Sequence, residues 1–369
     1  MISIKIAGLA KFMYDVAIIG GGPAGATLAR LIGDRYTVLL IEHRRLADPS
    51  EGFSALKCCG GLLAPDAQMM LSKLGLGLPK SVLEDPQLFV VKSIDIPQKL
   101  ERYYQRHYIN MNRQKFDAWL LSLVPATVDI RTGCRLQSYV DDADGFKLTL
   151  AEGKKRFDEK ARFLVGADGA KSKVRAQIGG RNDFPEKYVA IQEWVERKND
   201  RPYFTSIFDV DITDYYCWTI PKGNYLLIGA ALPYKQKAAE KFAFLKKKLK
   251  TYGMQFGKTV FREGTLIRRP LRLNQLSTGG NGIALLGEAG GWISPSSAEG
   301  LSYAFRSALM LADALQRSPE GSEKRYYETT RQLRNNIFFK NVKSHFIFKP
   351  LLRKIIMRSG LQSITLGRH

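Results

Sequence analysis

The stretch YDVAIIGGGPAGATLAR, which spans residues 14–30, decides the fold of this chain. An apolar run from Val16 to Ile19 ends in a glycine-rich turn, and a helical stretch over 26–31 follows. In such a unit the first glycine permits the tight turn, the second lets the backbone approach a pyrophosphate, and the third allows close packing of helix on strand. The residues of the turn are Gly20, Gly22, Pro23, Ala24 and Gly25. The segment therefore predicts a Rossmann-like nucleotide-binding unit.

A second apolar strand, over 37–41, follows the helix and ends in Glu42. An acidic residue at about this distance from the glycines accepts hydrogen bonds from a ribose 2′-OH, and the free N–H groups of the helix N-terminus favour phosphate. A glycine-rich turn without a ligand is the weaker interpretation, because strand, turn, helix, second strand and acid occur together.

The composition is that of a globular protein without a membrane span. The 369 residues, 45% of them hydrophobic, suffice for one large core or two lobes. No run of about 18 apolar residues occurs, so we expect no transmembrane helix. The segment before Met13 is too short for a signal peptide and is either a short extra strand or an over-extended start, with Met13 as the alternative start. The four cysteines form no CxxC pair, which favours a reducing cytoplasm over a disulfide framework.

The charge of the chain is unusual. Lys and Arg total 57 against 35 Asp and Glu, which gives a formal net charge of +22. From Thr329 to His369 there are nine basic residues and no acidic one. Such an excess indicates an anionic partner, either nucleic acid or acidic lipid. No zinc-finger spacing or RNA-binding motif is present, so we favour an anionic membrane surface over nucleic acid.

Two further strand ends carry a glycine turn with an acid. The run up to Val165 precedes Gly166-Ala167-Asp168-Gly169, and Ile283 to Leu286 precedes Gly287-Glu288. Alone, an Asp-Gly pair after a strand is an ordinary turn, but a carboxylate at such a strand end could hold a polyol chain such as ribityl. The loop SPSSAEGL, over 294–301, leads into a helix whose free N–H groups would face an electron-rich ring and stabilise a reduced, anionic flavin.

Three such strand ends in this order resemble the FAD-dependent para-hydroxybenzoate hydroxylase superfamily, over most of residues 14–315. The resemblance implies FAD as cofactor, with its pyrophosphate on the first motif. It implies that Asp168 and Gly169 lie near the pyrophosphate and ribose, and that Gly287 and Glu288 contact the ribityl chain. Arg113 looks like the family arginine that approaches the FAD phosphates. The family usually has Asp in place of Glu288, so the side chain at this position is one methylene longer than in the family.

Two segments are similar to motifs of the geranylgeranyl reductases, which reduce isolated double bonds in isoprenoid chains. KCCGG, at 57–61, is similar to their KxCGG segment, and YCWTIP, at 216–221, fits their YxWxFP motif with Ile220 in place of Phe. The resemblance implies that the first segment lies near the flavin, through Cys59, Gly60 and Gly61. It implies that the second lines the substrate cavity, through Tyr216, Trp218 and Pro221. The later loop looks like their P-x-x-GEG segment, with Ala298 replacing a glycine, and contributes Pro295, Gly300 and Leu301.

The predicted fold class is α/β: a two-lobed flavoprotein with a Rossmann-like FAD-binding lobe, an inserted β-sheet substrate lobe and a C-terminal helical tail. Helices are expected over 64–73, 112–122, 236–251 and 300–317, and a hairpin turn at Asp144-Gly145. The predicted boundaries assign 1–85, 111–180 and 276–325 to the FAD-binding lobe, 86–110 and 181–275 to the substrate lobe, and 326–369 to the basic tail.

The function that these resemblances imply is FAD-dependent reduction of a carbon–carbon double bond in an apolar, isoprenoid-type substrate. Reduced flavin N5 would deliver hydride to one alkene carbon, and an acid or water would protonate the other. Cys59 and Tyr216 are the catalytic candidates near the reacting carbon. The chain has no second GxGxxG, so the electron donor is either transiently bound NAD(P)H or a reduced electron-carrier protein. The four histidines stand in no ligand pattern, so no metal site is expected.

Other interpretations stay open. Cys59 could be a small buried residue, and Tyr216 and Trp218, two apart on one strand face, could belong to the core instead of a cavity wall. The alternative function is that of a flavin-dependent monooxygenase or halogenase, in which reduced flavin meets O₂. An alternative of another class is a membrane-docked flavoprotein that binds lipid or a partner without turnover.

The basic tail has the pattern of helices that lie on a membrane surface. Apolar residues recur at helical spacing with basic residues between them, and Pro350 breaks the run. The apolar residues are Phe338, Phe339, Val342, Phe346 and Ile347, then Leu351, Leu352, Ile355 and Ile356. The competing interpretation is that these helices cap the FAD-binding lobe, since amphipathicity alone does not distinguish a membrane face from a core face. We expect a cytoplasmic protein, peripheral at the membrane.

Overall fold

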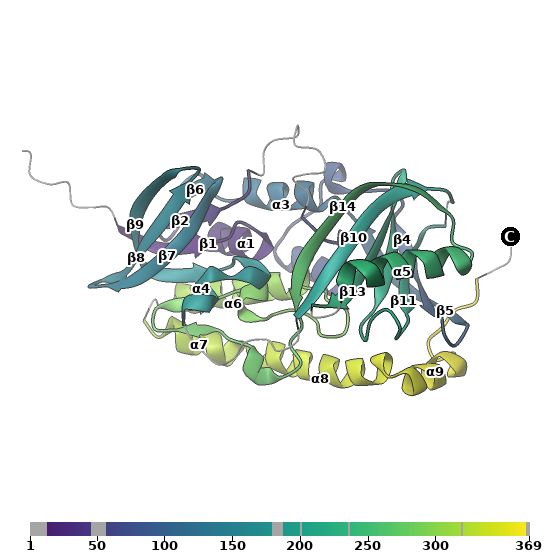
Figure 1. The fold of residues 1–369 in the computed structure, drawn as a ribbon. Helices are drawn as coiled ribbons and strands as arrows, with labels where there is room; N and C mark the ends of the chain where they lie inside the picture. Colours follow the sequence, from purple (N-terminus) through teal and green to yellow (C-terminus); the bar gives the residue numbers. More distant parts are fainter. Residues whose placement is uncertain are drawn as a thin grey trace, which may run out of the picture.

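The computed structural model describes residues 13–45, 57–178, 187–199, 201–234, 237–318 and 320–366. Two sheets stand side by side in it, with helices packed on the first sheet and along one edge of the molecule (Figure 1). The predicted α/β architecture with two lobes and a helical tail is confirmed. The segment before Met13, interpreted above as a short extra strand or an over-extended start, lies outside the described residues.

The first sheet carries the nucleotide-binding unit. Its strand order is β15-β16-β9-β1-β2-β6, and the hairpin of β7 and β8 is joined to β9. The strands are β1 (Met13–Ile19), β2 (Val38–Glu42), β6 (Asp129–Thr132), β7 (Cys134–Asp142), β8 (Gly145–Glu152), β9 (Lys155–Gly166), β15 (Gly279–Gly280) and β16 (Ile283–Leu285). β1 runs parallel to β2 and β9, and β9 runs parallel to β16. The carboxyl ends of β1, β9 and β16 therefore meet at one edge, which brings the three glycine turns together.

The second sheet is mostly antiparallel, in the order β14-β10-β13-β12-β11-β4-β5-β3. The strands are β3 (Leu62–Leu63), β4 (Leu88–Asp95), β5 (Leu100–Asn110), β10 (Lys187–Arg197), β11 (Tyr203–Phe208), β12 (Cys217–Lys222), β13 (Tyr225–Pro233) and β14 (Phe256–Arg268). Helix α5 (Ala238–Thr251) packs on it through buried Phe242, Leu245 and Leu249. Strand β3 belongs to this second sheet, although the sequence analysis assigned residues 1–85 to the FAD-binding lobe. The boundaries of the lobes stay a prediction.

The remaining helices cover the first sheet or extend along the edge. They are α1 (Pro23–Ile32), α2 (Pro65–Lys73), α3 (Arg113–Ser122), α4 (Lys173–Ile178), α6 (Leu301–Arg317), α7 (Ser322–Thr329), α8 (Arg331–Phe348) and α9 (Pro350–Ser359), with short 3₁₀ turns at Lys80–Val82, Gly169–Lys171, Leu273–Gln275 and Gly287–Gly290. Buried aliphatic residues of α1 and α6 share one core with β1 and β2. The predicted helices and the break at Pro350 are confirmed. In the described part of the chain, no helix is long and apolar enough to cross a membrane.

Candidate active site

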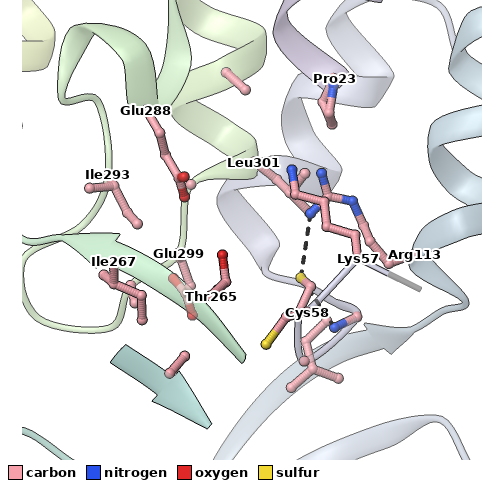
Figure 2. Close-up of a pocket in the computed structure, with 18 of the residues that line it drawn as sticks. Pro23, Lys57, Cys58, Arg113, Thr265, Ile267, Glu288, Ile293, Glu299 and Leu301 are labelled. Atoms are coloured by element: carbon pink, nitrogen blue, oxygen red, sulfur yellow. Dashed lines mark hydrogen bonds between the residues drawn. The ribbon is translucent and has the colours of Figure 1, made fainter. Parts of the chain in front are cut away.

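A cavity of about 240 Å³ lies where the two sheets meet. It is far larger than the roughly 10–15 Å³ that a cavity needs to hold one water molecule, so it has room for a ligand and is not a packing defect. The carboxyl edge of the first sheet and the loop before α6 line one side, and β10, β11, β12 and β14 line the other. Figure 2 shows Arg113 and Lys57 close together, with Glu288 and Glu299 across the cavity from them.

The three glycines of the first motif differ in what surrounds them. Gly20 has φ +109°, and a Cβ there would lie 2.4 Å from the Ala167 carbonyl oxygen, so only glycine fits the turn. A Cβ on Gly25 would lie 1.9 Å from the Gly20 oxygen, so this glycine allows α1 to approach β1 closely. A Cβ on Gly22 would meet nothing within 4 Å, and Gly22 lines the cavity. Space for a ligand is therefore open at Gly22.

A chain of buried ionic contacts runs from the end of β2 to the cavity. The Gly21 main-chain N–H donates to Glu42 Oε2 over 2.8 Å, and Arg44 Nε donates to Glu42 Oε1 over 3.0 Å. Arg44 Nη1 also reaches Asp117 Oδ2 over 3.0 Å. Burial alone would raise the pKa of Glu42, but hydrogen bonds from His43 and Arg44 outweigh it and hold that pKa well below its usual range. Glu42 thus fixes the glycine turn as an anion, whereas its contact with a ribose stays a prediction.

The series of ionic contacts ends at the cavity in two cationic side chains, Arg113 and Lys57. Arg113 Nε donates to Asp117 Oδ1 over 2.6 Å, and its Nη1 lies 3.4 Å from Cys59 Sγ (Figure 2). Lys57 lies beside this pair, and the Arg113 guanidinium lowers the pKa of Lys57. Asp117 is shared with Arg44, and the other anion that acts on Lys57 is Glu288, across the cavity. A diphosphate group would relieve the repulsion between the two cations.

The second and third strand ends lie where the sequence predicts, beside the first. Gly169, Gly287 and Glu288 line the cavity. Asp168 Oδ2 accepts the main-chain N–H of Lys173 over 2.7 Å, and no partner in the described structure reaches the buried Asp168 Oδ1. Because a buried polar atom without a partner is costly, Asp168 Oδ1 is suited to a donor on a bound ligand.

The wall of the cavity on the second sheet is mostly aromatic and aliphatic. Trp218 is 8% exposed, and its Nε1 donates to Gln192 Oε1 over 3.0 Å. Its indole lies over Gly229, where a Cβ would come within 2.2 Å of the ring. The Tyr216 hydroxyl donates to the Ser297 carbonyl over 2.7 Å, which ties this wall to the loop before α6. Trp218 is therefore buried and Tyr216 half-buried, and both belong to the cavity lining.

Sequence reasoning missed a polar pair on the cavity wall. The Tyr108 hydroxyl donates to Glu299 Oε1 over 2.6 Å, and Arg106 lies 3.4 Å from Glu299 Oε2. Burial, and then the neighbouring Glu299, raise the pKa of Tyr108 well above its usual range. Glu299 could have been noticed in the loop next to Gly300. Tyr108 stands within strand β5, where the sequence gives no local indication of a site.

A second missed residue, Lys222, holds the cysteine loop in place. It directly follows Pro221, is 3% exposed, and its Nζ donates to the carbonyl oxygens of Gly61 and Met111 over 3.0 and 2.8 Å. Burial lowers the pKa of Lys222 to about 7. The loop with Cys59 is therefore fixed by a buried amine that no described carboxylate pairs. Gln192, whose Nε2 lies 3.2 Å from Cys58 Sγ, was missed too, although a polar residue inside an apolar strand is an indication of such a role.

Most of the predicted site residues line this one cavity. Those that do are Gly22, Pro23, Ala24, Cys59, Gly60, Gly61, Arg113, Gly169, Tyr216, Trp218, Gly287, Glu288, Gly300 and Leu301. Those that lie behind it are Gly20, Gly25, Glu42, Asp168, Pro221 and Pro295. The Pro221 carbonyl accepts a hydrogen bond from the Asn110 side chain, and the Pro295 carbonyl accepts one from Arg269. Both prolines thus support the lining from behind. No group of three or more described His, Cys, Asp or Glu side chains is placed to hold a metal ion.

Comparison with known proteins assigns the chain to a family. The model of the FAD binding domain family, from the para-hydroxybenzoate hydroxylase-like superfamily, matches residues 13–251. The chain belongs to this family. A curated relative, protein CbrA of Escherichia coli O9:H4 (strain HS), is 43% identical over 360 residues, which are 95% of this chain and 94% of CbrA. As a member of the FAD binding domain family, this protein is an FAD-dependent oxidoreductase.

Two solved structures share the fold of this FAD-binding protein, each at 18% identity. One is a geranylgeranyl bacteriochlorophyll reductase-like protein from Thermoplasma acidophilum, with a TM-score of 0.81, over 94% of this chain and 91% of that one. The other is PqsL, a probable FAD-dependent monooxygenase from Pseudomonas aeruginosa, with a TM-score of 0.67, over 95% of this chain and all of that one.

The residues present fit FAD. Open space at Gly22, the cationic side chains of Arg113 and Lys57, and the N-terminus of α1 suit the pyrophosphate. The carboxylate of Glu288, which lines the cavity, suits the hydroxyl groups of the cofactor as an acceptor. The N-terminus of α6, at Leu301, faces the same cavity.

Proposed function

We propose that this protein reduces a carbon–carbon double bond of an apolar, isoprenoid-type substrate. The observation that carries the proposal is the two-sided cavity, with a charged cradle for FAD on one wall and an aromatic and aliphatic wall on the other. When bound in its reduced form, FAD supplies a hydride. The chain itself binds and orients the substrate, excludes water and supplies a proton.

The apolar wall supports an apolar substrate. Tyr216, Trp218, Phe204, Ile220 and Ile267 line it. Apolar area contributes roughly 25 cal/mol per Å² when it leaves water, so a hydrocarbon chain gains most from these side chains. The Trp218 ring is held by Gln192 and Gly229, and it therefore presents a fixed surface against which a chain can be positioned.

Addition of a hydride to one alkene carbon requires a proton at the other. The candidates are the Cys59 thiol, the Tyr216 hydroxyl, and the pair of Tyr108 and Glu299, all on the cavity lining. Burial raises the pKa of Tyr216 well above its usual range, and that of Tyr108 is also raised. Both phenols therefore keep their protons at neutral pH. Two electrons per turnover come from NAD(P)H or from a reduced electron-carrier protein.

An anaerobic single turnover tests the proposal. Protein loaded with FAD is reduced with dithionite and mixed with geranylgeraniol or its diphosphate in detergent. We expect the flavin absorbance to return without O₂, together with a product that has gained two hydrogens by mass spectrometry. Flavin that reoxidises only with O₂, with oxygen or halide inserted into a product, would support the alternative.

That alternative, a flavin-dependent monooxygenase or halogenase, is favoured by one observation: the protein shares its family fold with PqsL. The similarity of the KCCGG and YCWTIP segments to geranylgeranyl reductase motifs favours the reductase. Bound FAD that no donor reduces would instead indicate a flavoprotein that docks on a membrane without turnover.

A further inference from the structure

The outer face of α8 and α9 exposes large apolar side chains. Seven of the seventeen exposed large hydrophobic residues in the described part of the chain lie between Phe338 and Leu361. They are Phe338, Phe339, Val342, Phe346, Leu351, Ile355 and Leu361, with exposed fractions from 46% to 74%. The two helices follow one another along one edge of the molecule (Figure 1). We call this surface the tail face.

The opposite side of these helices is already packed. Leu333 and Ile337 are fully buried against Trp292 and Tyr303. Arg353 forms a buried ion pair with Asp95 of β4 over 2.7 Å. A helix that merely covered the protein would be polar outside. The exposed phenylalanines are therefore not explained by the packing of the tail on the rest of the chain.

Basic side chains border the tail face. Lys343, Lys349 and Arg358 are exposed and Lys354 is half-buried. The basic residues of these helices that meet acids, Lys340 and Arg353, point to Asp66 and Asp95 of the body. Among the described residues, no acid pairs the four that border the tail face, and the sequence holds no acid from Thr329 onward. The tail face therefore combines apolar surface with unneutralised positive charge.

We propose that the tail face docks on an anionic lipid bilayer. The apolar side chains would enter the boundary between headgroups and acyl chains, and the basic side chains would lie at the lipid phosphates. A second copy of the chain would place basic residues against basic residues at a shared face. A nucleic acid would neutralise the charges but leave Phe339, Phe346 and Leu351 in water.

Docking in this way brings the bilayer close to the cavity. Phe348, the last residue of α8, stacks on Tyr216 with ring centroids 6.5 Å apart, and Tyr216 lines the cavity. A lipid-dissolved substrate would thus lie near the wall that binds it. The docking itself rests on the tail face alone and does not depend on the proposed reaction.

Vesicle flotation of the full chain loaded with FAD tests the proposal. We expect binding to phosphatidylcholine vesicles that contain phosphatidylglycerol, little binding to phosphatidylcholine alone, and weaker binding as salt rises. Lys343→Gln/Lys349→Gln/Lys354→Gln should weaken binding on the order of a hundredfold, since each charge strengthens it roughly fivefold. Phe339→Ser/Phe346→Ser/Leu351→Ser should abolish it with FAD still bound.

Matched control variants show whether vesicle binding depends on the tail face or only on the overall charge and hydrophobicity of the protein. Lys154→Gln/Arg156→Gln/Lys247→Gln removes three exposed charges elsewhere, and Val140→Ser/Val210→Ser/Val260→Ser removes three exposed apolar side chains elsewhere. Both should bind vesicles like the wild type. Equal loss in these controls, no binding to anionic vesicles, or a wild-type dimer in light scattering that the Phe339 variant lacks would each overturn the proposal.

Discussion

Two glycines of one turn, Gly22 and Gly25, should respond to substitution in opposite ways. Gly22 has φ −74° and ψ −174°, which any residue adopts, and a Cβ there meets nothing within 4 Å. Gly22→Val should therefore change the free energy of unfolding of the protein without FAD by about 1 kcal/mol or less. Its side chain would occupy the approach to the pyrophosphate, so FAD should bind at least roughly tenfold more weakly, about 1.4 kcal/mol.

Gly25→Ala should do the reverse and destabilise the fold. Its Cβ would lie 1.9 Å from the Gly20 oxygen, whereas ordinary contacts begin at 3.4 Å, so backbone must move by about 1.5 Å. We expect a loss of about 3 kcal/mol or more in unfolding free energy. Chemical denaturation of both variants without FAD, and titration of each with FAD by fluorescence quenching, measure the two effects. Gly22→Val with wild-type FAD affinity, or Gly25→Ala with wild-type stability, would refute the reasoning.

Three further predictions concern the cavity. Trp218→Ala should change the preference for substrate chain length in product profiles while FAD stays bound; a purely structural Trp218 would instead cost about 3–5 kcal/mol and affect all substrates alike. If Tyr108 and Glu299 supply the proton, Tyr108→Phe and Glu299→Gln should slow anaerobic flavin reoxidation roughly 10²–10⁴-fold, with unchanged FAD affinity. Unchanged rates would leave the Cys59 thiol or the Tyr216 hydroxyl as the proton donor. Since the pKa of Lys222 is about 7 when folded and about 10.4 when unfolded, the unfolded state binds more protons between these values. The free energy of unfolding should therefore rise with pH in this range, by up to roughly 1 kcal/mol per pH unit. Chemical denaturation at a series of pH values checks this, and a Lys222→Met variant whose unfolding free energy depends on pH as steeply as that of the wild type would contradict it.

The edge that holds the three glycine turns was predictable because its determinants are local. Each turn directly follows an apolar strand in the sequence, and parallel strands present their carboxyl ends at one edge. Gly20, Asp168 and Glu288 therefore come together once the strands are recognised. The same applies to α1 and α6, whose helical periodicity is plain in the sequence.

The polar contacts of the cavity were not predictable because they join distant parts of the chain. Tyr108 and Glu299 are 191 positions apart, and Lys222 reaches back 161 positions to Gly61. No spacing rule relates such pairs, since each depends on how the two sheets meet. Likewise the fit of the Trp218 ring over Gly229 follows from the pairing of β12 with β13.

In the tail, too, the helices were predictable from the sequence, but the side that packs on the rest of the chain was not. Its sequence predicts amphipathic helices on both sides of Pro350, and the structure has them. The pattern alone could not tell which apolar residues pack inward. Leu333 and Ile337, absent from the predicted apolar set, are buried, whereas Phe339 and Phe346 are exposed.

A crystal structure of the FAD complex with a bound isoprenoid tests most directly the claim that one cavity holds cofactor and apolar substrate. We predict the pyrophosphate at Gly22 and Arg113, and the flavin ring between the Cys59 loop and the loop that ends at Gly300. The isoprenoid chain should lie against Trp218 with a double bond facing the flavin. A flavin ring outside this cavity, or an isoprenoid that binds with no contact to Trp218, would contradict the account.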